Sequence, residues 1–459
     1  MRSSLCVILF GLMLTGTPPA GATGQVTLLR HLFINHGMSG PNYYSNCWGY
    51  TDSTGREYAL MGSVTGTSIV EITIPDSARE VAFIPGPSSS WREIKTHSHY
   101  AYVVSEGGGG TQIINLSQLP DTAWLANAFT HTSGGKNTSR VHSISIHDGV
   151  MFLNGCATWS PGGVVMFSLA NPEQPAFLGE FATEYIHDSF VRNDTLFGSD
   201  IYSPGGLYVV DISNKSNPQT ITEITYPGAG THNAWTTEDG QYVLTTDEIG
   251  NTPKTLKVWD IRNLPTYTKV ADFTVDPTAT VHNVHIKGRY AYVAWYAAGV
   301  HVVDIANPAQ PVHAGGYDTY PGTQTSPYNG CWGVFPFYNS NKFIACDRYT
   351  GLYILELDTT VSAVGPLESS RPAEFALHQN YPNPFNPRTI INYQNATKNW
   401  VTLKVYDVLG REMASLVNEI QDSGLHSVAW DASGQPSGVY FYRLRSGTLV
   451  EQKKMILMK

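Results

Sequence analysis

The sequence predicts an all-β protein, in which a seven-bladed β-propeller is followed by a small Ig-like β-sandwich. One observation is a strand-like unit that recurs seven times between residues 48 and 356. A second is that each unit contains about four short strands separated by turn residues. The third is a change of character after Asp358, beyond which the chain has strand patterns of its own. A repeat of this length with strand periodicity indicates one supersecondary unit packed against copies of itself.

Two landmarks define the repeat. The first is an apolar run, clearest in Gly206-Leu-Tyr-Val-Val-Asp211 and Gly299-Val-His-Val-Val-Asp304, and its copies end at Glu71, Asn115, Ser168, Asp211, Asp260, Asp304 and Glu356. The second lies upstream in each unit, at Trp48, Trp91, His142, His187, His232, His282 and Trp332. Four strands repeated seven times are typical of a propeller, whereas the coils of a β-solenoid are usually about half as long.

The regions before and after the repeats suggest how the chain is divided. Residues 1–22 are predicted to be a signal peptide, because Arg2 precedes a short apolar run and Ala20-Gly-Ala22 offers a cleavage site. Residues 23–357 form the predicted propeller, with residues 25–35 supplying the outer strand that closes the last blade. Residues 358–376 resemble a linker, and residues 377–459 form the second domain. No later segment has the ~20 apolar residues of a transmembrane helix.

Charge and cysteine content limit the partners and the chemistry. The net charge of −9 argues against a nucleic-acid partner, since no basic stripe is present. Four cysteines follow the signal peptide, and export would permit disulfides among them. Both buried thiols and a bridge are consistent with the sequence, with Cys331 and Cys346 as the candidate pair within one repeat; the four are Cys47, Cys156, Cys331 and Cys346.

The C-terminal segment carries a motif made of several separate parts. It begins with Asn380, Tyr381, Pro382, Asn383, Pro384, Phe385, Asn386 and Pro387, and continues with Leu403-Lys-Val-Tyr-Asp-Val-Leu-Gly410 and Ser437-Gly438-Val-Tyr-Phe-Tyr442. This pattern closely resembles the type A C-terminal sorting domain of the type IX secretion system. An ordinary Ig-like module without a sorting role is the alternative.

The repeats carry a second resemblance. Gly206-Leu-Tyr-Val-Val-Asp211 and Gly299-Val-His-Val-Val-Asp304 are similar to the units of LVIVD-repeat propellers, often called choice-of-anchor B proteins. Together the two resemblances imply a route: the signal peptide directs the chain across the inner membrane, and the type IX machinery, its expected partner, moves it across the outer membrane. The mature body would then be extracellular or attached to the outer-membrane surface.

Histidines and carboxylates recur at matching places in the repeats. Because the second landmark opens the inner strand and a later loop returns to the same face, these side chains should meet at one mouth of the channel. The candidates are His142, His187, Asp188, His232, Asp247, Glu248 and His282. Imidazole and carboxylate are the usual ligands of a divalent metal ion, the candidate cofactor. The alternative is that each histidine hydrogen-bonds the backbone of a neighbouring blade.

The expected function is therefore a secreted or cell-surface binding or scaffold propeller, without catalysis, whose ligand is an extracellular protein or a glycan. The aromatic residues could line a glycan-binding rim or pack between blades; they are Trp48, Trp91, Trp235, Trp295 and Trp332. No Gly-x-Ser-x-Gly or phosphate-loop motif is present. The alternative function is a metal-dependent extracellular hydrolase or oxidoreductase that uses the histidines and acids of the mouth.

Overall fold

The computed structural model describes residues 25–36, 43–202, 204–250, 252–320, 326–358, 375–377, 380, 385–395, 397–421 and 424–458. The predicted signal peptide, residues 359–374 of the predicted linker and residues 381–384 of the sorting motif lie outside these ranges. The contacts between residues divide the chain into two compact units, Met1–Ala363 and Val364–Lys459, which are described separately below.

The first unit is built from four-stranded antiparallel sheets, seven of which lie within the described part of residues 25–358. The first two contain β2 (Tyr44–Thr51), β3 (Glu57–Ser63), β4 (Gly66–Glu71), β5 (Arg79–Pro85), and β6 (Arg92–His97), β7 (Tyr100–Ser105), β8 (Thr111–Asn115), β9 (Trp124–Phe129). The third and fourth contain β12 (Ser143–His147), β13 (Val150–Asn154), β14 (Val164–Ser168), β15 (Ala176–Phe181), and β16 (Asp188–Arg192), β17 (Thr195–Asp200), β18 (Gly206–Asp211), β19 (Gln219–Ile224).

The next two sheets contain β20 (Thr231–Thr236), β21 (Tyr242–Asp247), β22 (Leu256–Asn263), β23 (Thr266–Phe273), and β24 (Val284–Lys287), β25 (Tyr290–Ala294), β26 (Val300–Asp304), β27 (Val312–Tyr317). The last contains β28 (Cys331–Phe335), β29 (Lys342–Asp347), β30 (Gly351–Asp358) and, as its fourth strand, β1 (Gln25–Leu32). A hairpin of β10 (Thr132–Ser133) and β11 (Lys136–Asn137) and a single 3-10 turn, η1 (Pro75–Ser77), complete the described part of this unit.

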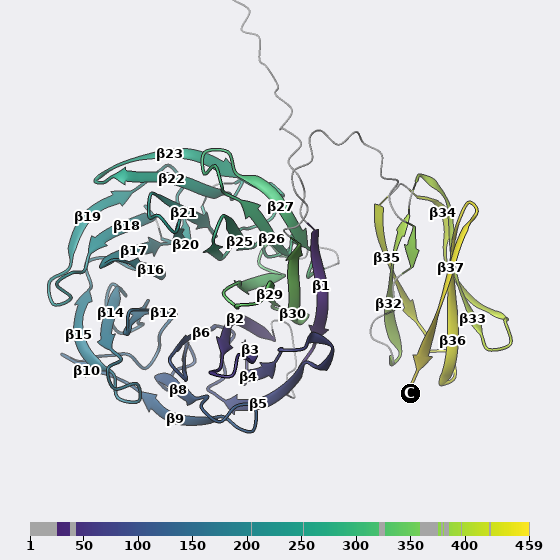
Figure 1. Cartoon of the computed structure of the whole chain (residues 1–459), viewed down its shortest axis with the longest axis horizontal. Coiled ribbons are helices and arrows are strands. Elements are labelled where there is room, and N and C mark those ends of the chain that lie inside the picture. The colour runs from purple at the N-terminus through teal and green to yellow at the C-terminus, as the bar shows by residue number, and fades with distance from the viewer. Residues whose placement is uncertain are drawn as a thin grey trace, which may run out of the picture. The chain divides into compact units, whose positions relative to one another are not determined.

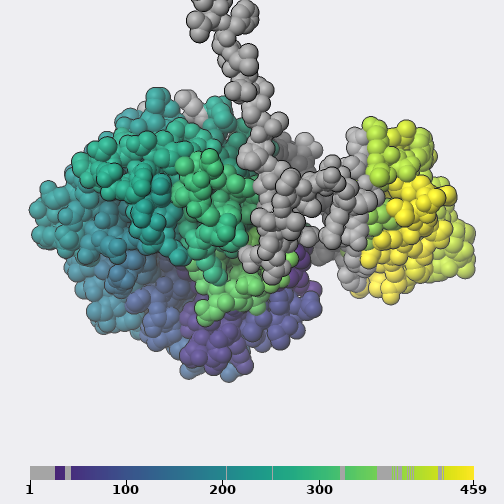
Figure 2. Space-filling model, turned by 45° about the horizontal axis from the view of Figure 1, so that its top comes forward, coloured from purple at the N-terminus to yellow at the C-terminus, as the bar shows by residue number. Residues whose placement is uncertain are grey.

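The sheets stand side by side in a ring around a central axis (Figure 1). Each inner strand contacts the inner strand of the next sheet, and β28 contacts β2, which closes the ring. The space-filling view shows the same order of colours around the body, with the purple first sheet beside the green last one (Figure 2). The predicted fold class, an all-β propeller followed by a β-rich C-terminal domain, is confirmed.

Strand β1 pairs antiparallel with β30, so that Gln25 lies opposite Asp358 and Leu32 opposite Leu352. Val26 of β1 is buried with Tyr353 and Leu355 in the apolar core of the last sheet. Without β1, the backbone of β30 would form an open edge that another chain could pair with. The last sheet is therefore made from both ends of the propeller sequence.

Apolar side chains from consecutive sheets meet between the blades. Val258 of β22 and Val293 of β25, for example, lie fully buried in one core cluster with Trp295. Burying a valine side chain stabilises a fold by roughly 1.5–3 kcal/mol, so these layers hold the ring together. Glycine is also required at the start of the apolar run that ends at Asp304. Gly299 has φ +89°, and a Cβ at this position would lie 2.2 Å from the carbonyl oxygen of Tyr317.

The strand registers correct the residues that the sequence assigns to the second landmark of the repeat. A β-bulge lies at His232 in β20 and at Trp332 in β28, and the matching bulge in β2 spans Ser45 and Asn46. Ser45 therefore occupies the position of the landmark residues in the first blade, and the expectation that Trp48 does so is wrong. Trp48 lies farther along β2 and packs against Phe335, with 4.8 Å between the ring centroids. In the second blade Glu93 pairs with Val104 as Asn233 pairs with Thr246, so Arg92, and not Trp91, directly precedes it at the landmark position. Among the seven blades, tryptophan therefore occupies the landmark in the last one, at Trp332.

The cysteines after the predicted signal peptide, Cys47, Cys156, Cys331 and Cys346, are buried and unpaired. The bridge considered for Cys331 and Cys346 is not formed. Burial raises the pKa of the Cys156 thiol to about 12, which keeps it protonated at neutral pH. These residues therefore act as small apolar side chains of the core.

The second unit is a two-sheet β-sandwich. One sheet has the order β31 (Ala376–Leu377), β32 (Arg388–Asn395), β35 (Gly424–Asp431), and the other has β34 (Glu412–Gln421), β33 (Asn399–Asp407), β36 (Gly438–Ser446), β37 (Leu449–Leu457). Alternate residues of β33, namely Val401, Leu403 and Val405, are buried in a core that also contains Trp430 of the opposite sheet.

The described residues of the sorting motif are tied into this sandwich. Asn380 is 1% exposed; its backbone NH donates to the Tyr442 hydroxyl at 2.7 Å and its side chain donates to Thr389 Oγ1 at 2.8 Å. Phe385 is buried in the core. Asn386 is exposed and Pro387 is half-buried. Gly410, with φ +77°, ends a turn that Asp407 stabilises, and Gly438 begins β36.

A histidine cluster in the propeller channel

A small cavity lies where the inner strands begin. Six of the seven sheets contribute to its lining, which consists of Trp91, Arg92, Glu93, His142, Ser143, His187, Asp188, His232, His282, Asn283 and Trp332. Its interior volume of about 20 Å³ is enough for one water molecule or one metal ion. Side chains that lie roughly 45 residues apart in sequence thus meet because each blade repeats the same strand start.

Four of the lining residues, His142, His187, His232 and His282, form a continuous arc that we call the histidine cluster. Their ring centroids are separated in turn by 3.9, 4.7 and 3.9 Å. His142 Nε2 lies 3.0 Å from His187 Nε2. The arc continues into Trp332, whose ring lies 5.0 Å from that of His282, and then into Trp91 at 5.8 Å.

Groups outside the arc fix the orientation of three of these rings. His142 Nδ1 donates to Glu106 Oε1 at 2.6 Å, and His282 Nδ1 donates to the Trp332 carbonyl at 2.6 Å. His187 Nδ1 lies 3.2 Å from the Tyr185 hydroxyl. When Nδ1 donates in this way, a neutral imidazole carries its proton on Nδ1 and its lone pair on Nε2.

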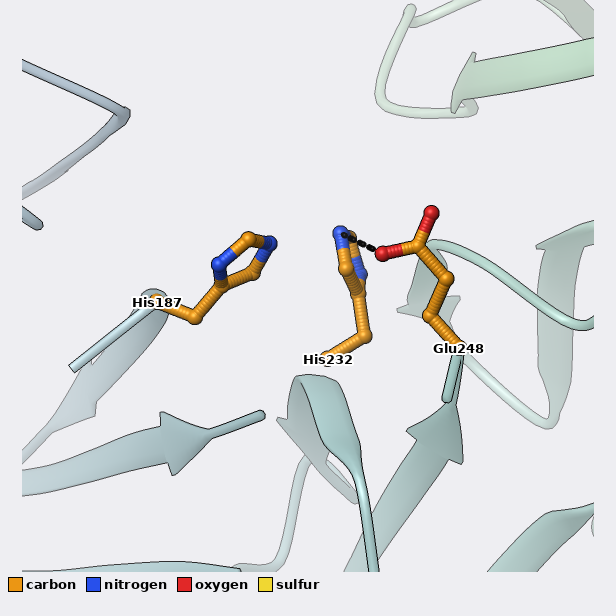
Figure 3. A group of neighbouring side chains, drawn as sticks. All are labelled: His187, His232 and Glu248. Carbon is orange, nitrogen blue, oxygen red and sulfur yellow. Dashed lines mark ion pairs between the residues drawn. The ribbon is translucent and has the colours of Figure 1, made fainter. Parts of the chain in front are cut away.

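Glu248 extends from the end of β21 toward the arc (Figure 3). Its Oε2 lies 3.8 Å from His232 Nε2 and its Oε1 lies 3.9 Å from His282 Nε2. One ligand atom from each of His187, His232 and Glu248 can be chosen so that all three lie within 4.8 Å of one another. The Tyr296 hydroxyl donates to Glu248 Oε1 at 2.5 Å, while Oε2 faces His232.

Burial favours the neutral form of three rings of the histidine cluster, those of His187, His232 and His282. Removal from water, followed by the proximity of His142, His232 and His282, holds the pKa of His187 well below its usual range. Burial likewise lowers the pKa of His232, although Glu248 opposes the shift, and it lowers the pKa of His282 strongly. Neutral imidazole is the form that binds metal ions.

One residue farther along the inner strands lies a second ring of polar side chains. We call Asn46, Glu93, Ser143, Asp188 and Asn233 the polar belt. Asn233 Nδ2 donates to Asp188 Oδ2 at 2.6 Å, Ser143 Oγ donates to Asp188 Oδ1 at 3.3 Å, and Asn46 Nδ2 donates to Glu93 Oε1 at 3.1 Å. Burial raises the pKa of Glu93, against the opposing effect of the nearby Lys95 ammonium.

The structure therefore separates the residues that the sequence groups together. His142, His187, His232 and His282 share one cavity, and Glu248 approaches it. Asp188 also lines the cavity, but both of its carboxylate oxygens accept hydrogen bonds within the polar belt. Asp247 lies elsewhere: it accepts from Lys257 Nζ at 2.6 Å and from the Tyr226 hydroxyl.

Some residues of the cavity escape sequence reasoning. Asn283 follows the landmark His282 directly, whereas Glu93 lies two residues after Trp91 and is brought to the matching place by the strand register. Tyr185 and Tyr296 orient His187 and Glu248 from positions that vary between blades, and no repeat pattern marks them. Of the tryptophans considered for a rim, Trp91 is 38% exposed, whereas Trp295 is fully buried in the core.

Comparison with family models identifies two parts of the chain. Residues 379–458 match the secretion system C-terminal sorting domain, and residues 202–225 and 280–319 match the LVIVD repeat. The chain therefore carries LVIVD repeats and a C-terminal sorting domain, which implies export to the cell surface or beyond. No match tests the choice-of-anchor B assignment, which stays a prediction. No curated protein matches the chain. Within the described residues, no helix has the length and apolarity of a membrane span.

Solved structures show similarity in fold alone. Hydrazine synthase from Kuenenia stuttgartiensis aligns with 71% of this chain and 99% of its own at 8% identity and a TM-score of 0.51. PorZ of Porphyromonas gingivalis, a surface component of the type IX secretion system, aligns with 93% of this chain at 12% identity and a TM-score of 0.45; the chain spans 61% of that protein's length. A putative 6-phosphogluconolactonase from Bacteroides uniformis aligns at 14% identity, over 58% of this chain and 85% of its own, with a TM-score of 0.45.

Proposed function

We propose that the chain is exported by the type IX secretion machinery and presents a binding propeller at the cell surface or in the medium. The observation that carries this proposal is the sorting domain at residues 379–458. The propeller ends at β30 before that domain begins, so the body and the domain that directs it are separate units. The binding region of the body would be the end of the channel where the histidine cluster and the partly exposed Trp91 lie.

The export step can be tested by deleting residues 377–459 in a host that has a type IX system. We expect the truncated body to accumulate in the periplasm, while the full chain reaches the surface or the medium, as cell fractionation would show. A reporter protein fused to residues 358–459 controls for a body that is unstable on its own, and it should gain export. Surface delivery of the truncated body would contradict the proposal.

A second candidate function is metal-dependent hydrolysis or oxidation at the same end of the channel. The observation that favours it is the grouping of His187 and His232 with Glu248, a ligand set that catalytic metal sites also use. Turnover that is lost in chelator and restored by metal, in a panel of ester, peptide, phosphate and redox substrates, would support catalysis. Metal binding without such turnover would favour a binding role.

The partner of the body is proposed to be an extracellular protein or a glycan. Trp91 is the tryptophan near the cavity that remains accessible, and its ring lies beside the ring of Trp332 and the guanidinium group of Arg348. Aromatic faces of this kind bind the apolar faces of sugars or apolar side chains of proteins. Binding on a glycan array that disappears in Trp91→Ala would identify a sugar as the partner.

A further inference from the structure

We infer that the cavity is a binding site for a divalent transition-metal ion of the zinc class, with His187, His232 and Glu248 as ligands and His142 as the fourth. The inference deepens the proposed function and rests on it, because it names a ligand for the cavity through which the exported body is proposed to act. Two or three imidazoles with one carboxylate suit zinc better than calcium or magnesium, which prefer oxygen ligands.

The separations between the candidate atoms suit such an ion. Two ligands at zinc–ligand distances of about 2.0–2.1 Å in a tetrahedron lie about 3.3 Å apart. The two Nε2 atoms of His142 and His187 are 3.0 Å apart, and His232 Nε2 and Glu248 Oε2 are 3.8 Å apart. These pairs lie slightly inside and slightly outside the ideal separation. One ligand atom from each of His187, His232 and Glu248 lies within 4.8 Å of the other two, so side-chain rotations would bring these three around one ion, and His142 would join them through its contact with His187.

The hydrogen bonds around the cavity turn lone pairs toward its centre. His282 Nδ1 donates to the Trp332 carbonyl, so the neutral ring has only an acceptor at Nε2, which faces the acceptor Glu248 Oε1 at 3.9 Å. Neither atom can donate to the other, and a cation between or beside them removes this conflict. Residues that orient ligands through such outer hydrogen bonds are a regular feature of metal sites.

The contact between His142 and His187 provides a place for the ion. Glu106 accepts the Nδ1 proton of His142, so His142 Nε2 can only accept, and a single proton on His187 Nε2 holds the two atoms at 3.0 Å. When that proton moves to His187 Nδ1, where the Tyr185 hydroxyl can accept it, both Nε2 atoms present lone pairs. The metal ion would then occupy the position of the shared proton, and no redox change is involved.

Other acids nearby are excluded by their own hydrogen bonds. Asp188 has Asn233 on one oxygen and both Ser143 and the Ser189 backbone NH on the other, so its lone pairs point into the polar belt. Asp247 is bound to the Lys257 ammonium. Glu93 is bound to Asn46 and to Lys95. Glu106 is occupied by the Nδ1 proton of His142, and Glu248 is the carboxylate that faces the Nε2 atoms of His232 and His282.

The test uses the mature full chain, treated with EDTA, dialysed and then titrated with zinc chloride. We expect one zinc per chain by elemental analysis and a calorimetric Kd that weakens at least about 100-fold in His187→Ala and in His232→Ala, since even outer residues of metal sites change affinity by about 10- to 100-fold. Zinc should also raise the Tm of the wild-type chain but not that of these variants.

The matched control is His301→Ala. His301 is also a histidine in contact with a second one, because its Nδ1 lies 3.0 Å from His313 Nε2, but no carboxylate forms an ion pair with either ring in the described part of the chain. This variant should keep one zinc and the wild-type Kd. If the alanine variants do not fold, as judged by circular dichroism, Glu248→Gln replaces the carboxylate at equal size and should weaken zinc binding at least about 10-fold.

A wild-type chain that retains no stoichiometric zinc would overturn the inference, as would equal losses in His187→Ala and His301→Ala. These results are independent of the export test. A zinc-free body that still requires residues 377–459 for export would leave the proposed function standing. A body that binds zinc but reaches the surface without those residues would overturn the export proposal and leave the metal site intact.

Discussion

The histidine cluster and the polar belt lie one residue apart on the same inner strands, yet their surroundings differ. Polar groups within and beside the belt hydrogen-bond one another: Asp188 accepts hydrogen bonds from Ser143, Ser189 and Asn233. In the histidine cluster, by contrast, His282 and Glu248 direct acceptor atoms toward each other at 3.9 Å. A buried polar ring whose groups are satisfied holds blades together, whereas one with converging lone pairs is ready to receive a ligand. Amino-acid substitutions can test this division.

The largest effect is expected for Asp188→Ala. Ser143 keeps the His187 carbonyl as its acceptor at 2.6 Å. The change leaves two buried donors, the Ser189 backbone NH and the Asn233 amide, without their acceptor, which should lower the free energy of unfolding by about 3 kcal/mol. Urea denaturation measures this loss. The variant should still bind one zinc, whereas His187→Ala should lose it. Loss of zinc in Asp188→Ala with the fold intact would place this residue in the metal site.

Asp347 is a buried carboxyl group that, unlike Asp247, forms no salt bridge with a described residue. It pairs in register with Cys331, as Asp247 pairs with Thr231, but Asp247 has Lys257 beside it. Burial raises the pKa of Asp347 to about 6. Since the unfolded value is about 3.9, the folded chain holds a proton that the unfolded chain has lost, and stability falls as pH rises from about 4 to about 6.

Asp347→Asn should remove this dependence. Relative to the wild type, the variant should gain about 2 kcal/mol of unfolding free energy between pH 4 and pH 7, because one pKa unit corresponds to about 1.4 kcal/mol. Urea denaturation at the two pH values gives the difference. A difference that stays constant across this range would show that Asp347 is already ionised in the folded chain at pH 4.

Tyr296→Phe gives a smaller effect that concerns the metal site alone. The variant removes the hydroxyl that donates to Glu248 Oε1, so the carboxylate loses its fixed orientation. Zinc affinity should fall about 10-fold while stoichiometry stays at one, and the Tm of the zinc-free chain should change little. An unchanged Kd would mean that Glu248 is oriented by other groups, such as His282.

The smallest effect on stability is expected for Trp91→Ala. The side chain is 38% exposed and its contacts are limited to the edge of the cavity, at Trp332 and Arg348. The free energy of unfolding should change by less than about 1 kcal/mol, and zinc binding should persist. A larger loss of stability would show that Trp91 belongs with the packing residues of the channel instead of with an accessible rim.

Much of this fold can be predicted from the sequence because each blade repeats the same strand ends and turns. The marker Asp304, for instance, accepts from the Ala306 NH at the end of its strand, and Asp211 does the same for Ser213. Such repeated turn chemistry makes the strand pattern readable without a structure. The four histidines were predictable as neighbours for the same reason: equivalent positions in a ring of blades converge on its axis.

The features that the sequence does not reveal are set by strand register and by side-chain partners on other strands. The register of β2 places Ser45, three residues before Trp48, at the position of the landmark residues, and apolar periodicity does not show this. Asp247 and Glu248 differ in role because Asp247 is paired with Lys257, which lies on the next strand. Whether a carboxylate is free for a ligand is decided by such partners, which lie at no fixed spacing from it.

The pairing of β1 with β30 has a consequence for the protein after export. The first described residue, Gln25, pairs with Asp358 in the last sheet, so the first strand of the body helps to close the ring of sheets. A surface peptidase that trimmed the chain as far as Leu32 would remove this strand and uncover the backbone of β30. Two trimmed molecules could then join through their open strands. The lifetime of the displayed protein would thus depend on how well its first few residues resist digestion.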